Sequence, residues 1–254
     1  MTSKPQAYVI CATPRSGSTL LCSLLAATRV AGRPNSFFRS QSRPEWAHEW
    51  GLPAMAAVSD RAFTRRYVDA MRKEGTAQTG VFGLRIIAEN IRDASAVLDQ
   101  LYPGLPNDRA RYDAAFGKTV YIHLTRQDQV AQAVSLIKAR QSGLWHVAPD
   151  GSELERLSPA KPVDYNAGLI TRQIAEYQAA ERAWQYWFVG QKITPLRLTY
   201  EGLATAPFDT LTDVLRHLGL SPSAADGVAP GVAPLADAVS REWIARYRRA
   251  EPDV

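Results

Sequence analysis

The chain has 254 residues, a formal net charge of +5, a hydrophobic fraction of 46% and a charged fraction of 22%. These proportions are typical of a soluble globular protein and exclude an intrinsically disordered chain. The length suits one sizeable α/β domain, because no linker or repeat divides it. The positive charge suits an anionic ligand, but nucleic acid is not an expected partner, because no long Lys/Arg run with interleaved aromatic residues appears.

The first predicted elements are an apolar strand from Ala7, a polar loop over residues 13–19 and a helix over about residues 18–28. A strand that leads through a glycine-containing turn into a helix leaves backbone N–H groups free to bind an anion. Gly17 lets the backbone approach a ligand, and Arg15 adds a fixed positive charge. Hydroxyl groups that can donate to an oxyanion come from Ser16, Ser18 and Thr19.

This phosphate loop, residues 13–19, is not a Walker A sequence, because no lysine directly precedes its last hydroxyl residue. We therefore expect a ligand that carries phosphate or sulfate, bound without the Walker lysine. The alternative for the motif alone is an ordinary serine-capped turn between a strand and a helix.

The middle of the chain continues as alternating strands and helices. An irregular segment over residues 30–59, rich in Pro, Arg, Ser and aromatic residues, is expected to form a substrate loop and is called the acceptor segment below. Helical patterns follow over residues 60–73 and 89–101, and strand patterns over residues 81–87 and 119–124. The last of these strands leads through Arg126 into a helix with Val130, Val134 and Ile137 on its buried stripe.

The second half begins with a polar, proline-containing stretch over residues 142–163. Asp164 is expected to cap a long helix whose apolar stripe runs from Ile170 to Phe188, followed by a strand over residues 193–198 and a helix over residues 207–218. A mobile connection over residues 221–234 then leads to a basic amphipathic segment, residues 240–249. Strands that alternate with helices predict an α/β fold in which a P-loop-like parallel sheet has helices on both faces and binds its ligand at the carboxyl ends of the strands.

The N-terminal residues enter the first predicted strand too early to leave room for a signal peptide, and no later apolar run approaches the length of a membrane span. We therefore expect a cytoplasmic protein with no transmembrane segment. Cys11 and Cys22 lack the paired spacing of a metal or redox site, so both are expected to be buried small hydrophobic residues.

Three further segments, taken with the phosphate loop, resemble one enzyme family. They are residues 123–126 (His-Leu-Thr-Arg) with Ser135 on the next helix, residues 198–203 (Leu-Thr-Tyr-Glu-Gly-Leu) and residues 243–249 (Trp-Ile-Ala-Arg-Tyr-Arg-Arg). The combination resembles the sulfotransferases that use 3′-phosphoadenosine 5′-phosphosulfate, and among them the bacterial trehalose-sulfating family. The similarity extends over essentially the whole chain.

The resemblance implies the sulfotransferase fold in a single domain over residues 1–254. It also implies 3′-phosphoadenosine 5′-phosphosulfate as the donor, 3′,5′-bisphosphoadenosine as the product, no metal, and a hydroxyl of a carbohydrate or glycolipid as the acceptor. Members of the family can dimerise, which makes a homodimer an expectation here.

On the donor side, the resemblance places the 3′-phosphate of the nucleotide at Arg126 and Ser135. Arg15 and the loop amides are expected to meet the charge that develops during sulfuryl transfer, which resembles phosphoryl transfer in its loose transition state. The basic C-terminal segment is expected to close over the nucleotide, or else to form a solvated face. Its arginines are Arg246, Arg248 and Arg249.

On the acceptor side, this chain departs from the family. Ser36 stands where the trehalose-sulfating enzymes have a glutamate that is taken as the general base, Arg33 stands in place of an acidic residue, and Arg85 in place of a lysine. Glu45, His48 and Glu49 are alternative sources of a base. Aromatic residues expected to stack on a sugar, or else to belong to a satellite core, are Phe37, Phe38, Trp46 and Trp50.

The sequence thus predicts a sulfotransferase in which Arg15 and Ser36 occupy the catalytic positions. Two alternatives stay open at this point. One is a relative that binds the nucleotide without catalysis or with an altered acceptor, because a neutral serine is not a base at neutral pH. The other is a P-loop kinase, against which the absent Walker lysine argues.

Overall fold

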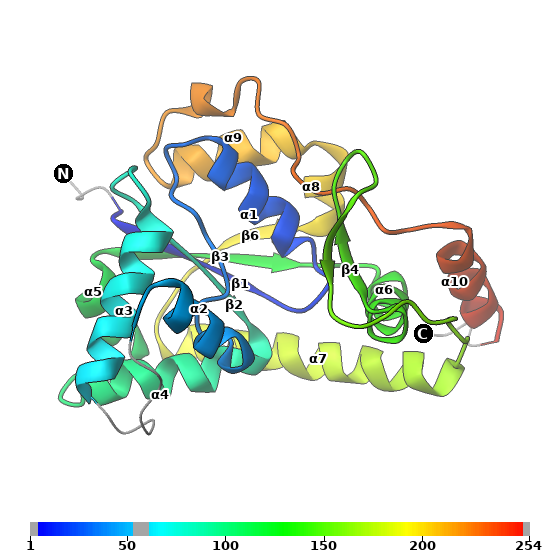
Figure 1. Cartoon of the computed structure of the whole chain (residues 1–254), viewed down its shortest axis with the longest axis horizontal. Helices are drawn as coiled ribbons and strands as arrows, with labels where there is room; N and C mark the ends of the chain where they lie inside the picture. The colour runs from blue at the N-terminus through cyan, green and yellow to red at the C-terminus, as the bar shows by residue number, and fades with distance from the viewer. Residues whose placement is uncertain (1–4, 53–60, 251–254) are drawn as a thin grey trace.

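The computed structural model describes residues 5–52 and 61–250. Within them a four-stranded sheet has the order β2-β1-β3-β6, and each neighbouring pair of strands is parallel (Figure 1). The predicted parallel sheet is therefore confirmed. The strands are β1 (Ala7–Ala12), β2 (Phe82–Ile87), β3 (Thr119–Thr125) and β6 (Leu196–Thr199).

The central strand β1 is buried along its whole length, because helices cover both faces of the sheet (Figure 1). Val9 and Cys11 face one core cluster with helices α3, α4, α5 and α7, whereas Tyr8 and Ile10 face a second cluster with α1, α8 and α9. These helices are α1 (Ser18–Ala27), α3 (Arg61–Thr76), α4 (Ile91–Leu101), α5 (Asp108–Phe116), α7 (Ala167–Gly190), α8 (Tyr200–Thr205) and α9 (Pro207–His217).

A third core cluster joins α6 (Gln129–Ser142) and α7 to α10 (Ala238–Ala250). The basic C-terminal segment is thus a helix that is docked by its apolar face. Trp243 is 4% exposed, and the buried hydroxyl of Tyr247 lies 2.9 Å from the hydroxyl of Thr171 on α7. The predicted stripe on α6 is also buried: Val130, Val134 and Ile137.

Two parts of the chain differ from the sequence prediction. The prediction that Asp164 caps the long helix is wrong, because the Asn166 side chain caps α7 by accepting from Leu169 N, while Asp164 N donates to Gln141. The acceptor segment is not irregular throughout, since it contains α2 (Arg43–Glu49) after a 3₁₀ turn (Ser40–Ser42). Residues 53–59 of this segment lie outside the described residues.

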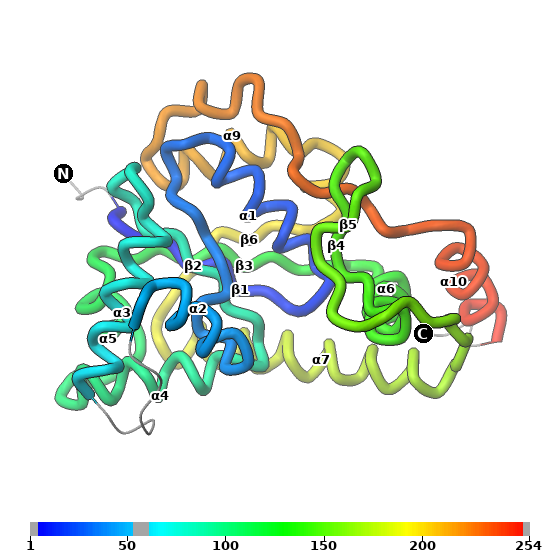
Figure 2. The backbone as a smooth tube through the Cα atoms, in the orientation of Figure 1, coloured from blue at the N-terminus to red at the C-terminus, as the bar shows by residue number. Residues whose placement is uncertain are grey.

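The polar stretch over residues 142–163 contains a hairpin that the sequence analysis did not predict. Its strands are β4 (Leu144–Val147) and β5 (Glu153–Arg156), and the turn between them contains Gly151 at φ +85°. Figure 2 shows the hairpin beside α6, between the end of the sheet and α10. An isolated bridge from Val147 to Ala233 holds it against the connection over residues 221–234, which includes the 3₁₀ turn Pro222–Ala225.

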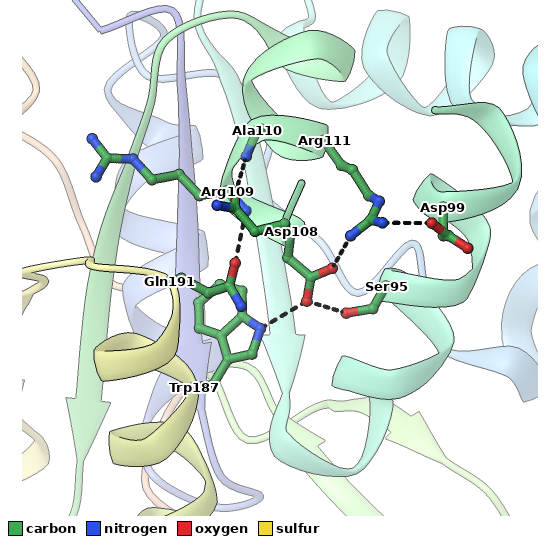
Figure 3. A network of polar contacts seen from close by, with 9 residues as sticks. Ser95, Asp99, Asp108, Arg109, Ala110, Arg111, Trp187 and Gln191 are labelled. Atoms are coloured by element: carbon green, nitrogen blue, oxygen red, sulfur yellow. Dashed lines mark hydrogen bonds and ion pairs between the residues drawn. The ribbon is translucent and has the colours of Figure 1, made fainter. Parts of the chain in front are cut away.

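Asp108 at the start of α5 fastens three helices together (Figure 3). Its carboxylate accepts hydrogen bonds from Ser95 on α4 at 2.6 Å and from Trp187 Nε1 on α7 at 2.9 Å, and it pairs with Arg111 at 3.2 Å. Asn107 caps α5 by accepting from the backbone N–H of Ala110. This network stabilises the helical layer that supports one face of the sheet.

Cys11 and Cys22 are both buried with free thiols, as the sequence analysis predicts. Among the helices of residues 5–52 and 61–250, none is long and apolar enough to cross a membrane.

Candidate active site

A pocket of about 980 Å³ opens at the carboxyl ends of the strands, and segments that follow all four strands of the sheet line it. Pro14 and Arg15 follow β1, Glu89 follows β2, Arg126 follows β3 and Tyr200 follows β6. In the sheet, β2 and β3 lie on opposite sides of β1. The phosphate loop, which follows β1, therefore lies at the point where the strand order changes direction, and open parallel sheets bind ligands at such points. The predicted position of the site is therefore the position of this pocket.

The phosphate loop is held in a strained conformation by its neighbours. Arg15 has φ +62°, a left-handed conformation that is strained for a residue other than glycine, whereas Gly17 adopts its φ of +86° freely. The Gln132 amide on α6 donates to Thr13 Oγ1 at 2.9 Å and to the Pro14 carbonyl at 2.7 Å. The Ser16 hydroxyl donates to the Thr13 carbonyl at 2.8 Å, so it stabilises the loop and does not line the pocket.

Gly17 also satisfies a steric requirement of the loop. A Cβ atom at this position would lie 2.6 Å from the Tyr200 ring. No side chain among the described residues caps the N-terminus of α1, which leaves its first backbone N–H groups available to a ligand. The loop therefore has the free donors and the close backbone approach that an anion site needs.

Two arginines place positive charge at this end of the pocket. Arg15 Nε donates to Ser135 Oγ at 3.0 Å and Nη1 donates to the Trp145 carbonyl at 2.7 Å. Burial, together with the nearby Arg126 guanidinium, lowers the pKa of Arg15 from its ordinary value. An anion that binds between these groups relieves their repulsion, so the site favours a negatively charged ligand.

Arg126 lies with its guanidinium 4.3 Å from the centroid of the Tyr200 ring, and its Nη1 donates to the Arg15 carbonyl at 3.3 Å. Its Nε is buried and has no hydrogen-bond partner among the described residues. Buried donors without partners are rare in proteins, so a ligand acceptor fits this position. The pocket thus brings together the donor-side residues that the sequence analysis names: Arg15, Gly17, Ser18, Thr19, Arg126 and Ser135.

Arg85 is a pocket residue whose role the sequence analysis did not identify. From β2 its Nε donates to Ser36 Oγ at 2.7 Å, and its Nη1 donates to Thr19 Oγ1 at 2.8 Å. One guanidinium therefore joins the acceptor segment to the phosphate loop. Lysine has no planar fork of donors, so a lysine, which the resemblance implies at this position, would not make both contacts in this geometry.

The hairpin contributes His146 and Glu155, which the sequence analysis also missed. His146 Nε2 lies 3.2 Å from Thr19 Oγ1 and 3.5 Å from Glu155 Oε2. Burial, together with the positive charges of Arg15 and Arg85, lowers the pKa of His146 to about 4. The imidazole is consequently neutral at neutral pH. The Pro149-Asp150-Gly151 turn signal could have revealed the hairpin, although not the direction in which it folds.

The predicted acceptor residues fall into two groups. Ser36, Glu45, Trp46 and Glu49 line the pocket. The remaining predicted residues do not line it: Phe37 and Phe38 are each 1% exposed in the hydrophobic core, Trp50 packs against that core, His48 is exposed, and Arg33 pairs with Glu74 at 3.0 Å. Phe37 and Phe38 are therefore core residues rather than sugar-stacking ones, and the core they belong to is the one that packs on β1 and not a satellite.

The arginines of the basic C-terminal segment do not line the pocket. The Arg246 guanidinium lies 4.0 Å from the centroid of the Tyr165 ring, and Arg248 pairs with Asp128 at 2.8 Å. Arg249 is exposed. The segment reaches the pocket instead through Ser240 and Ile244. In this structure the arginines of α10 therefore fasten the helix or face solvent. Within the part of the chain that the structure describes, no group of three or more His, Cys, Asp or Glu is arranged to hold a metal ion.

Comparison with known proteins identifies the family. The family model for Stf0 sulphotransferases matches residues 7–250. Trehalose 2-sulfotransferase of Mycolicibacterium smegmatis is 31% identical over 268 residues, which cover 98% of this chain and 97% of that protein. Trehalose 2-sulfotransferase of Mycobacterium tuberculosis is 30% identical over 273 residues, which cover 99% and 98%.

A solved sulfotransferase structure from Alicyclobacillus acidocaldarius matches with 16% identity and a TM-score of 0.41, covering 98% of this chain and 96% of that one, a score too low to support an argument. The resemblance inferred from the motifs is confirmed by the family model and by both full-length relatives. On that evidence the chain belongs to the Stf0 sulphotransferase family of enzymes.

Proposed function

We propose that this chain transfers a sulfuryl group from 3′-phosphoadenosine 5′-phosphosulfate to a hydroxyl group of a carbohydrate, as a single-domain enzyme. The observation that carries the proposal is the convergence of Arg15, Arg126 and the uncapped N-terminus of α1 at one end of one pocket. The other end of that pocket offers polar and aromatic side chains suited to a sugar.

The donor side fits a nucleotide that carries several negative charges. The unpaired Nε of Arg126 and the hydroxyl of Ser135 suit the 3′-phosphate, and the amides at Gly17 and Ser18 suit the 5′-phosphosulfate. Arg15 then lies where it stabilises negative charge on the oxygen that leaves the sulfur. The bound donor supplies the activated sulfuryl group, and these residues bind and orient it.

The acceptor side supports a carbohydrate. The half-buried Trp46 ring stacks on the Trp50 ring, with 5.4 Å between the ring centroids. Trp46 lines the pocket together with Glu45, Glu49 and Asn90. An indole face packs on the apolar side of a sugar ring. Carboxylate groups accept hydrogen bonds from the sugar hydroxyls, and an amide side chain both accepts from them and donates to them. Because both full-length relatives are named trehalose 2-sulfotransferases, trehalose is the first acceptor to test. A glycolipid that carries such a sugar is the alternative acceptor. The proposal also includes a homodimer and a cytoplasmic location.

The donor half of the proposal is tested by calorimetry without magnesium. We expect 3′,5′-bisphosphoadenosine to bind far more tightly than AMP, ADP or ATP, because it alone among them fills the 3′-phosphate site. Equal affinity for AMP and the bisphosphate would refute the donor assignment. Tight binding of ATP that depends on magnesium would instead favour a P-loop kinase.

The acceptor half is tested by incubating the protein with the donor and trehalose or other disaccharides and detecting sulfated product by mass spectrometry. A second candidate function, nucleotide binding without catalysis, is favoured by Ser36, whose hydroxyl accepts from the cationic Arg85 and is therefore not a base. Tight bisphosphate binding without sulfation of any acceptor in the panel would support this second candidate.

A further inference from the structure

Ser36 leaves the acceptor side of this pocket without a base at the family's position, and the structure offers another group. His146 lines the same pocket from β4, with its side chain 23% exposed. Its Nε2 is 3.2 Å from Thr19 Oγ1, at the end of the phosphate loop where α1 begins. A nitrogen base therefore lies beside the loop that is proposed to hold the transferred group.

The hydrogen bonds around Thr19 accommodate an imidazole whose Nε2 is unprotonated. Arg85 has only donors, so its 2.8 Å contact makes Thr19 Oγ1 an acceptor and leaves the threonine hydrogen free to point at His146 Nε2. When the threonine hydroxyl donates to Nε2, that nitrogen carries a lone pair and the neutral ring holds its proton on Nδ1. This tautomer presents an unprotonated nitrogen to the pocket.

The charged groups around the ring act in opposite directions. Burial, together with the charges of Arg15 from the loop and Arg85 from β2, lowers the pKa of His146 and keeps the free imidazole neutral. Glu155 on β5, 3.5 Å from Nε2, is placed to pair with the ring once it gains a proton. An anionic sulfuryl donor between the two arginines also offsets their charge, so the ring becomes a stronger base when the donor binds.

The backbone that carries the ring is held by contacts of the residues on both sides of His146. Arg15 Nη1 holds the preceding residue through the Trp145 carbonyl at 2.7 Å, and the following residue, Val147, bridges to Ala233. Other carboxylates that line the pocket are less suited. Glu45, Glu49 and Glu89 are exposed, and Asp237 pairs with Lys138.

We propose that His146 is the general base of this enzyme and accepts the proton of the acceptor hydroxyl at Nε2. The proposal rests on the sulfuryl transfer proposed above and deepens it. The acceptor O–H bond breaks and its proton moves to Nε2, while the acceptor oxygen forms a bond to sulfur. The bond from sulfur to the 5′-phosphate oxygen breaks, and its electron pair remains on the departing bisphosphate. The imidazolium pairs with Glu155 and then releases its proton to water.

The test compares His146→Gln with His217→Gln, an exposed histidine on α9 that serves as the matched control. Glutamine keeps a polar group beside Thr19 but is not a base. We expect His146→Gln to lower the turnover number for sulfation of trehalose, or of whichever disaccharide the wild type accepts, by about 10²–10⁴-fold. Its dissociation constant for 3′,5′-bisphosphoadenosine should stay within about threefold of the wild-type value, and His217→Gln should match the wild type in both measurements.

A second variant separates basicity from structure. In His146→Ala, added imidazole should restore part of the lost turnover, and the restored rate should rise with the fraction of imidazole that is unprotonated. The proposal is overturned if His146→Gln keeps more than about a third of wild-type turnover, if bisphosphate affinity falls in parallel with turnover, or if imidazole restores nothing. A wild type that sulfates no acceptor overturns the proposed function itself, and this inference with it. An active wild type with an equally active His146→Gln overturns the inference alone.

Discussion

Gly17→Ala tests how the phosphate loop, Tyr200 and Arg126 depend on one another. The new Cβ atom would lie 2.6 Å from Tyr200 Cδ2, which is closer than real Cβ contacts, so the ring must move. The Arg126 guanidinium, 4.3 Å from the centroid of that ring, then loses the contact that orients it toward the pocket. Alanine at φ +86° also adds about 1–2 kcal/mol of backbone strain.

Gly80→Ala is the matched control. Gly80 has φ +77°, so alanine there incurs similar strain, but nothing lies within 4 Å of its added Cβ atom. We expect Gly80→Ala to lose about 1–2 kcal/mol in the free energy of unfolding, which is about 2–8 °C in melting temperature, and Gly17→Ala to lose at least as much, because the displaced Tyr200 ring adds to the strain. In Gly17→Ala alone the displaced guanidinium loses a charge-assisted contact worth about 2 kcal/mol, so the dissociation constant for the bisphosphate should rise about 30-fold.

The two measurements are urea denaturation, followed by circular dichroism, and calorimetric titration with 3′,5′-bisphosphoadenosine. Both use the full chain, at a temperature where all three proteins are folded. Gly17→Ala that binds the bisphosphate as tightly as Gly80→Ala would refute the reasoning, because the contact between Tyr200 and Arg126 would then not position the cation. Equal loss of affinity in both variants would refute it as well, since strain alone would account for the effect.

Arg126→Ala should weaken bisphosphate binding by about 2–3 kcal/mol in calorimetry and leave AMP almost unaffected, and equal losses for both nucleotides would contradict the 3′-phosphate assignment. Trp243→Ala should lower the free energy of unfolding in urea by about 3–5 kcal/mol, because the indole is 4% exposed; a loss below about 1 kcal/mol would mean that α10 contributes little to the core. Because the pKa of His146 is lowered to about 4, the unfolded chain binds the additional proton between pH 6.5 and 4, and the free energy of unfolding falls as the pH falls through that range. In His146→Gln the free energy of unfolding should fall by up to about 3 kcal/mol less over this pH range than in the wild type. The same pH dependence of the free energy of unfolding in variant and wild type would show that the imidazole is not held neutral.

The residues of the proposed donor side could be predicted from the sequence because their arrangement is mostly local. The apolar run of β1, the turn at Gly17 and the start of α1 are consecutive, and together they dictate where backbone N–H groups converge. Arg126 leaves β3 and Ser135 sits two turns into α6, a spacing that helical periodicity fixes. Parallel strands then bring both ends to one edge of the sheet.

The acceptor side was decided by contacts between residues that are distant in the sequence. Thr19 meets His146 across 127 positions, and Arg85 meets Ser36 across 49, so no local pattern encodes either contact. Aromatic and basic residues were ambiguous for the same reason, since burial or a nearby partner decides whether they face a ligand. Phe37 is buried in the core, and the Arg246 guanidinium on α10 lies over the Tyr165 ring. The sequence by itself therefore determined the family through its motifs and the parallel sheet through its periodicity, and it predicted the phosphate loop through turn chemistry. Only the packing of the hairpin and the acceptor segment against that loop decided which charged and titratable side chains surround the proposed reaction.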